Sequence, residues 1–182
     1  GTINLKNFWI RRIKRLLPAV FVLIVVVGIA TLLFHPEHIV RVKHDMIAAI
    51  FYVSNWWYIA KDVNYFEQFS FMPLKHLWSL AIEEQFYLFF PAVLLLLMAI
   101  VKKKKNVILM FWIISLVSLL MMVVISQPHL NHSRVYFGTD TRLQTLLLGV
   151  LLAFIWPPFK LNPNPPKGLK TVINSAGIIG LT

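Results

Sequence analysis

Residues 16–34 read LLPAVFVLIVVVGIATLLF, nineteen residues without a charged side chain. At 1.5 Å per residue, such a helix is about 28 Å long, enough to cross the hydrocarbon core of a bilayer. The whole chain has the same character, because 58% of its 182 residues are hydrophobic, 14% are charged and the mean hydropathy is +0.72. A soluble domain needs charged side chains over most of its surface. The sequence therefore predicts an all-α, polytopic bundle of transmembrane helices.

Further apolar runs follow the first one along the chain. We expect one long helix at 77–101 despite Pro91, and a hairpin partner at 107–125 with Asn106 as its N-cap. The chain starts with Gly1 and its last run is too short to cross, so we expect 1–182 to be one part of a larger transmembrane domain, cut at both ends. The further runs are 46–60, 77–101, 107–125, 143–156 and 171–182.

The run 46–60 decides the predicted topology. If it spans, the 18 Lys and Arg divide equally, nine on each side, which gives no bias. If it dips in and returns, the basic N-terminal segment, the lysines 102–105 and the loop 160–170 share one face, twelve against six. We favour this re-entrant arrangement, with the twelve on the cytoplasmic side, and it predicts a site beside Asn55 and Trp56. A short, tilted span is the alternative.

Two adjacent carboxylates, Glu83 and Glu84, stand at the start of the run 77–101. Carboxylates beside an apolar run are costly unless they are paired, hydrated or protonated, which often marks a functional site. At 100° per residue, one helix face carries a polar stripe, with Glu84 on its edge and Gln85 opposite. A base, a hydroxyl, a carboxylate and a phenol on one face suit acyl transfer or proton relay. The stripe consists of His76, Ser79, Glu83 and Tyr87.

Arginines provide the expected partners and the expected donor site. One glutamate would serve as acid or base while the other binds an arginine, for which Arg142 is the candidate. The alternatives are that both glutamates are solvated near a helix start and that Arg142 makes an ordinary surface pair with Asp140. Arg12 and Arg15 share a helix face and could bind the diphosphate of a coenzyme A thioester; otherwise they only anchor the helix to anionic lipid.

Other classes of protein and of site are disfavoured. The chain has no cysteine, and its six histidines lack the spacing of a helical metal site, so we predict no metal. The net charge of +11 arises from basic residues that flank apolar runs, which indicates anionic lipid rather than nucleic acid as the partner.

The string HLWSLAIEEQFYL, residues 76–88, with Pro91 after it, resembles the signature of the acyltransferase-3 family of integral membrane acyltransferases. The segment Arg11 to Pro18 is similar to the RxxR loop of that family. The strings at 55–58 and 136–142 resemble family segments as well, in the same order. The sequence resembles those of Gram-positive bacteria, which indicates the branch of the family that O-acetylates peptidoglycan.

This resemblance implies a bundle of about ten membrane helices in the bacterial cell membrane. It implies acetyl transfer from cytosolic acetyl-CoA, a donor rather than a bound cofactor, to an extracytoplasmic glycan, possibly through a fused hydrolase-like domain. The catalytic histidine of the family would lie upstream of Gly1, and none of the histidines here matches it. The resemblance assigns donor binding to Arg12 and Arg15, and a site role to Glu83, Glu84, Tyr87 and Arg142. The alternative function is a transporter or channel whose path these charges line.

Overall fold

The computed structural model describes residues 4–64, 70–126, 133–155 and 175, and this part of the chain contains helices and loops but no strand. The all-α prediction is confirmed. Four helical segments are long and apolar enough to cross a membrane, and many of their large apolar side chains are exposed, as lipid contact requires. They are Leu5–Phe34, Leu77–Ile100, Lys104–Ile125 and Ser133–Ile155.

Helix α1 (Leu5–Phe34) begins earlier than the apolar run predicts. Asn4 is its N-cap, since the Asn4 side chain accepts a hydrogen bond from the backbone N–H of Asn7. The arginine segment is therefore continuous with the membrane helix, and the spacing of its side chains is helical. Pro18 lies within this helix.

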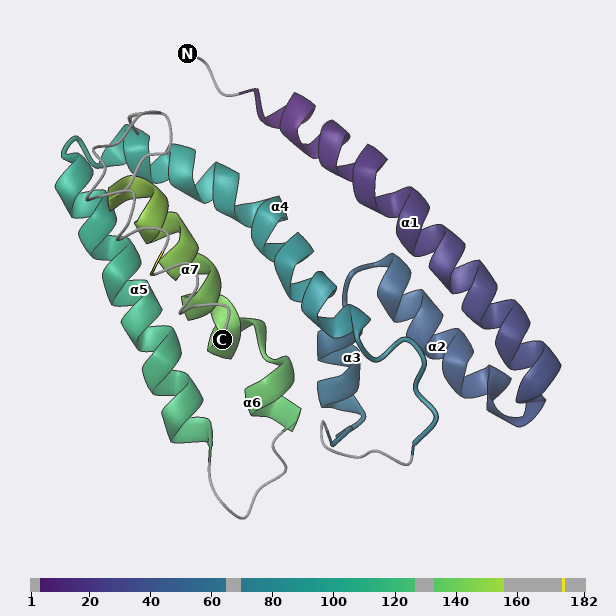
Figure 1. The fold of residues 1–182 in the computed structure, drawn as a ribbon. Helices are drawn as coiled ribbons and strands as arrows, with labels where there is room; N and C mark the ends of the chain where they lie inside the picture. Colours follow the sequence, from purple (N-terminus) through teal and green to yellow (C-terminus); the bar gives the residue numbers. More distant parts are fainter. Residues whose placement is uncertain (1–3, 65–69, 127–132, 156–174, 176–182) are drawn as a thin grey trace.

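The run 46–60 does not form one helix. The 3-10 turn η1 (Pro36–His38) leads into α2 (Ile39–Ile50), and α3 (Ser54–Ala60) follows after a turn. Tyr52, in that turn, has φ 53°, a left-handed conformation that stops α2. Helix α2 runs inward and α3 runs back toward the same end of the bundle, so this segment reverses direction instead of continuing as one helix (Figure 1). Such a reversal is what the re-entrant arrangement requires, and its place in a membrane stays a prediction; α2 and α3 are here called the re-entrant hairpin.

Helices α4 (Leu77–Ile100), α5 (Lys104–Ile125) and α7 (Thr139–Ile155) form the second half of the bundle, with the short α6 (Ser133–Phe137) before α7. Asn106 lies inside α5, so its prediction as the N-cap is wrong; the N-cap position is Lys103, since the helix starts one residue later. Helices α5 and α7 are antiparallel, and Lys104 lies over the ring of Phe154 at 5.3 Å. The predicted loop 160–170 is outside the described residues, as is nearly all of the predicted run 171–182.

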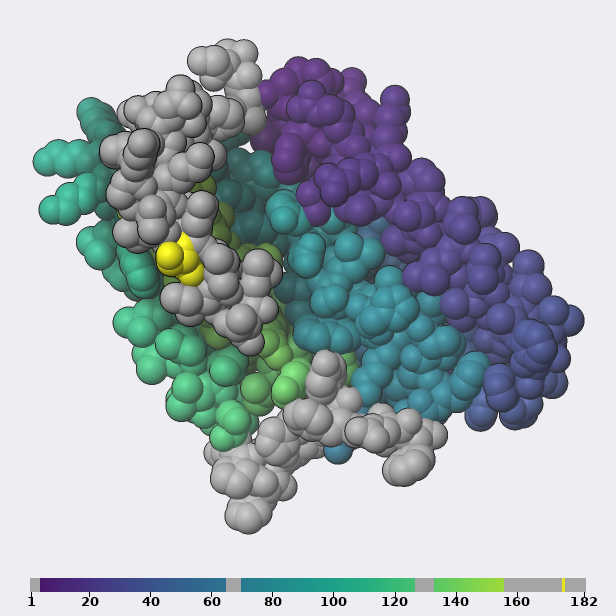
Figure 2. All heavy atoms as spheres, in the orientation of Figure 1, coloured from purple at the N-terminus to yellow at the C-terminus, as the bar shows by residue number. Residues whose placement is uncertain are grey.

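Two apolar cores flank α4. One joins α1, α2 and α4 around Ile24 and Leu77, and the other joins α4, α5 and α7 around Phe86 and Phe111. Gly28 lets α2 approach α1, because a Cβ there would lie 2.9 Å from Cε of Met46. In the space-filling view, α1 and α5 cover opposite flanks (Figure 2).

The ends of the helices fall into two groups. The start of α1, the connection from α4 to α5 and the end of α7 lie toward one end of the bundle, here called the basic end because it carries Arg11, Arg12, Arg15 and Lys102 to Lys105 (Figure 1). The end of α1, both outer ends of the α2–α3 hairpin, the end of α5 and α6 lie toward the other, here called the distal end. This grouping places the hairpin between α1 and α4.

Candidate active site

A paired arginine and carboxylate join α1 to α4. Nε of Arg12 donates to both carboxylate oxygens of Glu84, at 2.9 and 3.1 Å, and Nη2 donates to Oε1 at 2.7 Å. The side chains are 23% and 14% exposed, respectively. The predicted pairing of one glutamate with an arginine is therefore observed, but Arg12 is the partner. A forked contact of this kind fixes the guanidinium plane, which a single hydrogen bond would not do.

The ring of Tyr87 lies against the same arginine. The guanidinium carbon of Arg12 is 3.3 Å from the ring centroid of Tyr87, a cation–π contact. Trp9, one turn earlier on α1, donates its indole N–H to the backbone carbonyl of Tyr87 at 3.2 Å. Arg12 is therefore held on two sides by α4, and the register of α1 against α4 is fixed.

The Arg12–Glu84 pair lines a cavity of about 610 Å³ between α1, α4 and the turn of the re-entrant hairpin. Its walls are mainly apolar and include Leu17, Leu88 and Phe89. A largely apolar cavity with a few converging polar groups is typical of a ligand site. Burial and the nearby Glu84 carboxylate raise the pKa of Tyr52, which lines the same cavity.

Gln85 organises a polar network on the inner side of this cavity. Its amide nitrogen donates to the carbonyl of Tyr52 at 2.8 Å and to Oδ1 of Asn55 at 2.9 Å. Its amide oxygen accepts from Oγ1 of Thr139 at 2.7 Å and from the indole N–H of Trp56 at 3.3 Å. Asn55 is fully buried and donates to Thr139 and to the carbonyl of residue 137. The network joins α3, α4 and α7, and it holds the left-handed Tyr52 in place.

The network should make a measurable contribution to stability. We expect Gln85→Met to lower the free energy of unfolding by about 1–3 kcal/mol, because the Tyr52 carbonyl and the amide of Asn55 lose buried partners. Thermal unfolding of the detergent-solubilised protein, followed by tryptophan fluorescence, measures the change. Ser79→Ala is the control, since Ser79 is exposed and, among the described residues, hydrogen-bonds only to the carbonyl of His76 in its own helix turn. Equal transition temperatures for the two variants would show that the network is dispensable.

The arginines near α7 have other partners than predicted. Arg142 contacts the rings of Trp78 and Tyr136, at 5.7 and 4.9 Å, and neither glutamate of α4. Asp140 pairs with Arg134, at 2.7 and 2.5 Å, so the alternative surface pair with Arg142 is wrong as well. The short α6 explains both results, because it places an arginine close to Asp140 that the apolar pattern does not reveal.

The predicted polar stripe of α4 divides between two surroundings. His76, Ser79 and Glu83 are exposed, whereas Tyr87 is partly buried under Arg12. Within the described residues, Glu83 makes no hydrogen bond or ion pair. Besides Tyr87, the polar residues of this stretch that contact other helices are Glu84, on the edge of the stripe, and Gln85, opposite it. The three consecutive polar residues 83–85 span about 200° of the helix, more than one face. This width could have indicated that Gln85 contacts another helix.

The second predicted donor-site residue, Arg15, is exposed on α1, one turn beyond Arg12. It makes no contact with Glu84, so the structure brings together Arg12, Glu84 and Tyr87 but leaves Arg15, Glu83 and Arg142 outside this cluster. In the part of the chain that the structure describes, no three His, Asp or Glu side chains are grouped as metal ligands.

A family model described as "Acyltransferase domain" matches residues 1–178. The chain belongs to the acyltransferase-3 family. Among similar proteins of this kind, "Putative O-acetyltransferase SACOL0978" of Staphylococcus aureus (strain COL) is 69% identical over 177 residues, 97% of this chain and 29% of the relative. "O-acetyltransferase OatA" of Staphylococcus aureus (strain NCTC 8325 / PS 47) is 58% identical over 178 residues, 98% of this chain and again 29% of the relative.

The chain thus spans 29% of the length of the curated relatives it matches. No solved structure gives a significant match. The resemblance read from residues 76–88 and from the arginine segment is confirmed at the level of the family.

Proposed function

We propose that this chain forms part of a membrane-embedded O-acetyltransferase that moves an acetyl group from cytosolic acetyl-CoA to an extracytoplasmic carbohydrate. Family membership supports acyl transfer, and the names of the relatives support acetyl as the group. The acceptor is peptidoglycan or a surface polysaccharide, reached directly or through a hydrolase-like domain, and the protein lies in the bacterial cell membrane as a multi-pass protein. The observation that carries the proposal is Arg12, which is fixed by Glu84 and Tyr87 and lines an apolar cavity.

The arginines of α1 suit the diphosphate of the donor. Glu84 occupies Nε and Nη2 of Arg12, so Nη1 keeps its N–H donors for a phosphate oxygen. Arg15 is exposed one turn away on the same helix and supplies a second cation. Both residues lie toward the basic end of the bundle, where a cytosolic donor arrives (Figure 1).

The cavity beneath Arg12 suits the acyl end of the donor. Its apolar walls exclude water from a reactive thioester, while the Gln85 network supplies fixed dipoles on its inner side. In this mechanism the pair Arg12–Glu84 orients the donor. Helix α4, with Glu83 on its exposed side, positions and polarises the group that accepts the acetyl.

The two glutamates should differ in kinetics. Glu84→Gln should raise the KM for acetyl-CoA about tenfold, since an amide keeps one hydrogen bond to Arg12 and loses the charge. Glu83→Gln should instead lower kcat and leave that KM unchanged, because Glu83 does not touch Arg12. Acetyl transfer by membranes that contain the full-length variants measures both constants. If the Glu83→Gln variant is expressed normally and acetylates glycan at a near-normal level, the Glu83 carboxylate has no role in catalysis.

A labelling experiment tests the function itself. Membranes with the full-length protein and acetyl-CoA labelled in the acetyl group should yield label that is bound to glycan as an ester and released by mild base. Membranes with an Arg12→Lys variant serve as the matched control. If these membranes conduct ions or solutes and no glycan is labelled, the result favours the alternative function as a transporter or channel and contradicts acetyl transfer.

A further inference from the structure

A second pocket, of about 500 Å³, lies on the other side of α3, between this helix and α2. Trp57, Tyr58 and Lys61 line it from α3 and the residue after it, whereas Trp56 on the opposite face of α3 lines the cavity of the proposed donor site. The other residues that line the second pocket come from η1, α2, Val63 and Met72. Helix η1 and the outer ends of α2 and α3 lie toward the distal end of the bundle (Figure 1). Helix α3 therefore lies between two pockets. The first is lined by residues of α1 near the basic end of the bundle, and the second by residues of η1 and α2 near the distal end.

Two buried polar side chains of this second pocket each carry an atom without a hydrogen-bond partner within the described residues. Asp45 is 4% exposed and Tyr58 is 1% exposed. Oδ1 of Asp45 accepts from the indole N–H of Trp57 at 2.9 Å, but Oδ2 of Asp45 and the hydroxyl of Tyr58 have no hydrogen-bond partner within the described residues. Burial raises the pKa of both groups. Unpaired buried polar atoms are costly, so a pocket lined by two residues that carry them suits a ligand that pairs with both.

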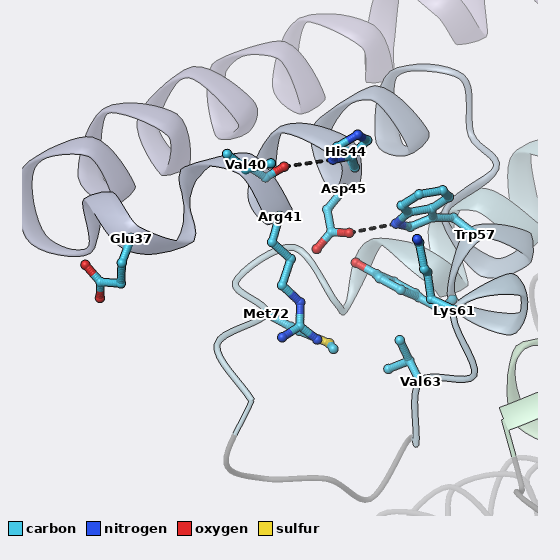
Figure 3. A pocket seen from close by; sticks show the side chains of 10 residues that line it. Glu37, Val40, Arg41, His44, Asp45, Trp57, Lys61, Val63 and Met72 are labelled. Atoms are coloured by element: carbon cyan, nitrogen blue, oxygen red, sulfur yellow. Dashed lines mark hydrogen bonds between the residues drawn. The ribbon is translucent and has the colours of Figure 1, made fainter.

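The charge of the lining favours a neutral ligand. Arg41 and Lys61 contribute two cations, which Glu37 and Asp45 balance with two carboxylates. Figure 3 shows Arg41 and Lys61 reaching into the pocket from its two sides, with Asp45 and Trp57 bonded between them. Arg41 and Lys61 are exposed, so their rotation gives access to the buried oxygens.

Two side chains of the protein already contact the ring of Trp57. The imidazole of His44 stacks on it at 5.7 Å with an interplanar angle of 14°, and Nζ of Lys61 is 4.9 Å from its centroid. A flat aromatic ligand would have to displace His44 or Lys61 in order to stack on this ring. Recognition must then depend on hydrogen bonds, which suits a ligand with several adjacent hydroxyl or amide groups.

We propose that this pocket binds a sugar unit of the carbohydrate acceptor, with adjacent hydroxyl or amide groups of the sugar bonded to Oδ2 of Asp45 and to the hydroxyl of Tyr58. The inference rests on the proposed function for the identity of the ligand, and it adds the place where the acceptor binds. A pocket of this volume lies within the range of small-ligand sites. Asp45 and Tyr58 are thereby binding residues on the distal side of the hairpin.

Direct binding to the full-length protein in nanodiscs tests the inference, with a soluble β-1,4-linked N-acetylglucosamine oligomer as the probe and calorimetry as the readout. We expect saturable binding by the wild type and at least tenfold weaker binding by Tyr58→Phe and Asp45→Asn. Both substitutions spare folding, because the Tyr58 hydroxyl has no partner within the described residues and an asparagine still accepts from Trp57. Tyr52→Phe is the matched control, since Tyr52 lines the other cavity.

A parallel transfer assay separates this inference from the proposed function. If Tyr58→Phe raises the KM for the oligomer and leaves the KM for acetyl-CoA unchanged, the result supports both the sugar-binding pocket and the proposed function. Binding by the wild type that Tyr58→Phe weakens, without any acetyl transfer, supports the pocket and contradicts the function. Transfer by the wild type with no change of affinity or KM in either variant overturns the pocket and leaves the function standing. Absence of binding by the wild type also overturns the pocket.

Discussion

The substitution Arg12→Lys should lower kcat/KM for acetyl-CoA about 100-fold, equivalent to about 2.7 kcal/mol. Lysine keeps the charge but lacks the planar fork that contacts both oxygens of Glu84 and stacks on Tyr87. The phosphate-binding cation would then be free to move, and Glu84 would keep a poorly matched partner in a half-buried site. Steady-state transfer by the full-length protein, with acetyl-CoA as the varied substrate, measures the loss.

Arg11→Lys is the matched control, since Arg11 is the adjacent arginine, is exposed and makes no hydrogen bond or ion pair within the described residues. It should change kcat/KM by less than about threefold, the range of a surface charge. The double variant Arg12→Lys with Glu84→Gln should lose little more than Arg12→Lys alone, because the two side chains act as one unit. Equal losses in Arg11→Lys and Arg12→Lys would show that only the net charge of this segment matters.

The substitution Gly138→Ala should destabilise the junction of α6 and α7 by about 2–3 kcal/mol. An added Cβ would overlap Nη1 of Arg134 and lie 2.7 Å from Oγ1 of Thr141 and 2.8 Å from the backbone oxygen of Arg134. The backbone contact cannot be relieved by a rotamer change, and the displaced Arg134 would lose Asp140. A lower transition temperature of the detergent-solubilised protein and a loss of acetyl transfer are the expected results.

Gly149→Ala provides the control on the same helix. A Cβ at Gly149 meets nothing within 4 Å, and this exposed position is inside α7, where alanine is favoured over glycine by about 1 kcal/mol. Its transition temperature should stay equal or rise slightly. If the transition temperature of Gly149→Ala fell as far as that of Gly138→Ala, the destabilisation could not be attributed to the close contacts at Gly138.

Most of the helices could be predicted because apolar length is a local property of the chain. The run 107–125 and α5 end at the same residue, and 77–101 differs from α4 by one residue. The early start of α1 was missed because the cap at Asn4 precedes a charged segment rather than an apolar one. The helix α6 was missed because its five residues are too few to show a period.

The partners within the site were harder to predict than its residues. The prediction that one of the two adjacent glutamates binds an arginine is confirmed by Glu84. The choice of Arg142 as its partner is wrong, because sequence order does not show which helices are adjacent. Helical geometry predicts Gln85 opposite the polar stripe and gives it no role. In the structure Gln85 faces the re-entrant hairpin, and its amide nitrogen is 2.9 Å from Oδ1 of Asn55.

The sequence by itself determined that this chain is a membrane bundle of the acyltransferase-3 family, since length, hydropathy and a local motif are written in consecutive residues. Only the tertiary structure decided that Arg12 meets Glu84, that Gln85 meets Asn55 and that α3 separates two pockets. The physical reason is that these contacts join residues 30 or more positions apart. Their geometry depends on how tilted helices pack and where a left-handed turn reverses the chain, and neither is encoded in local periodicity.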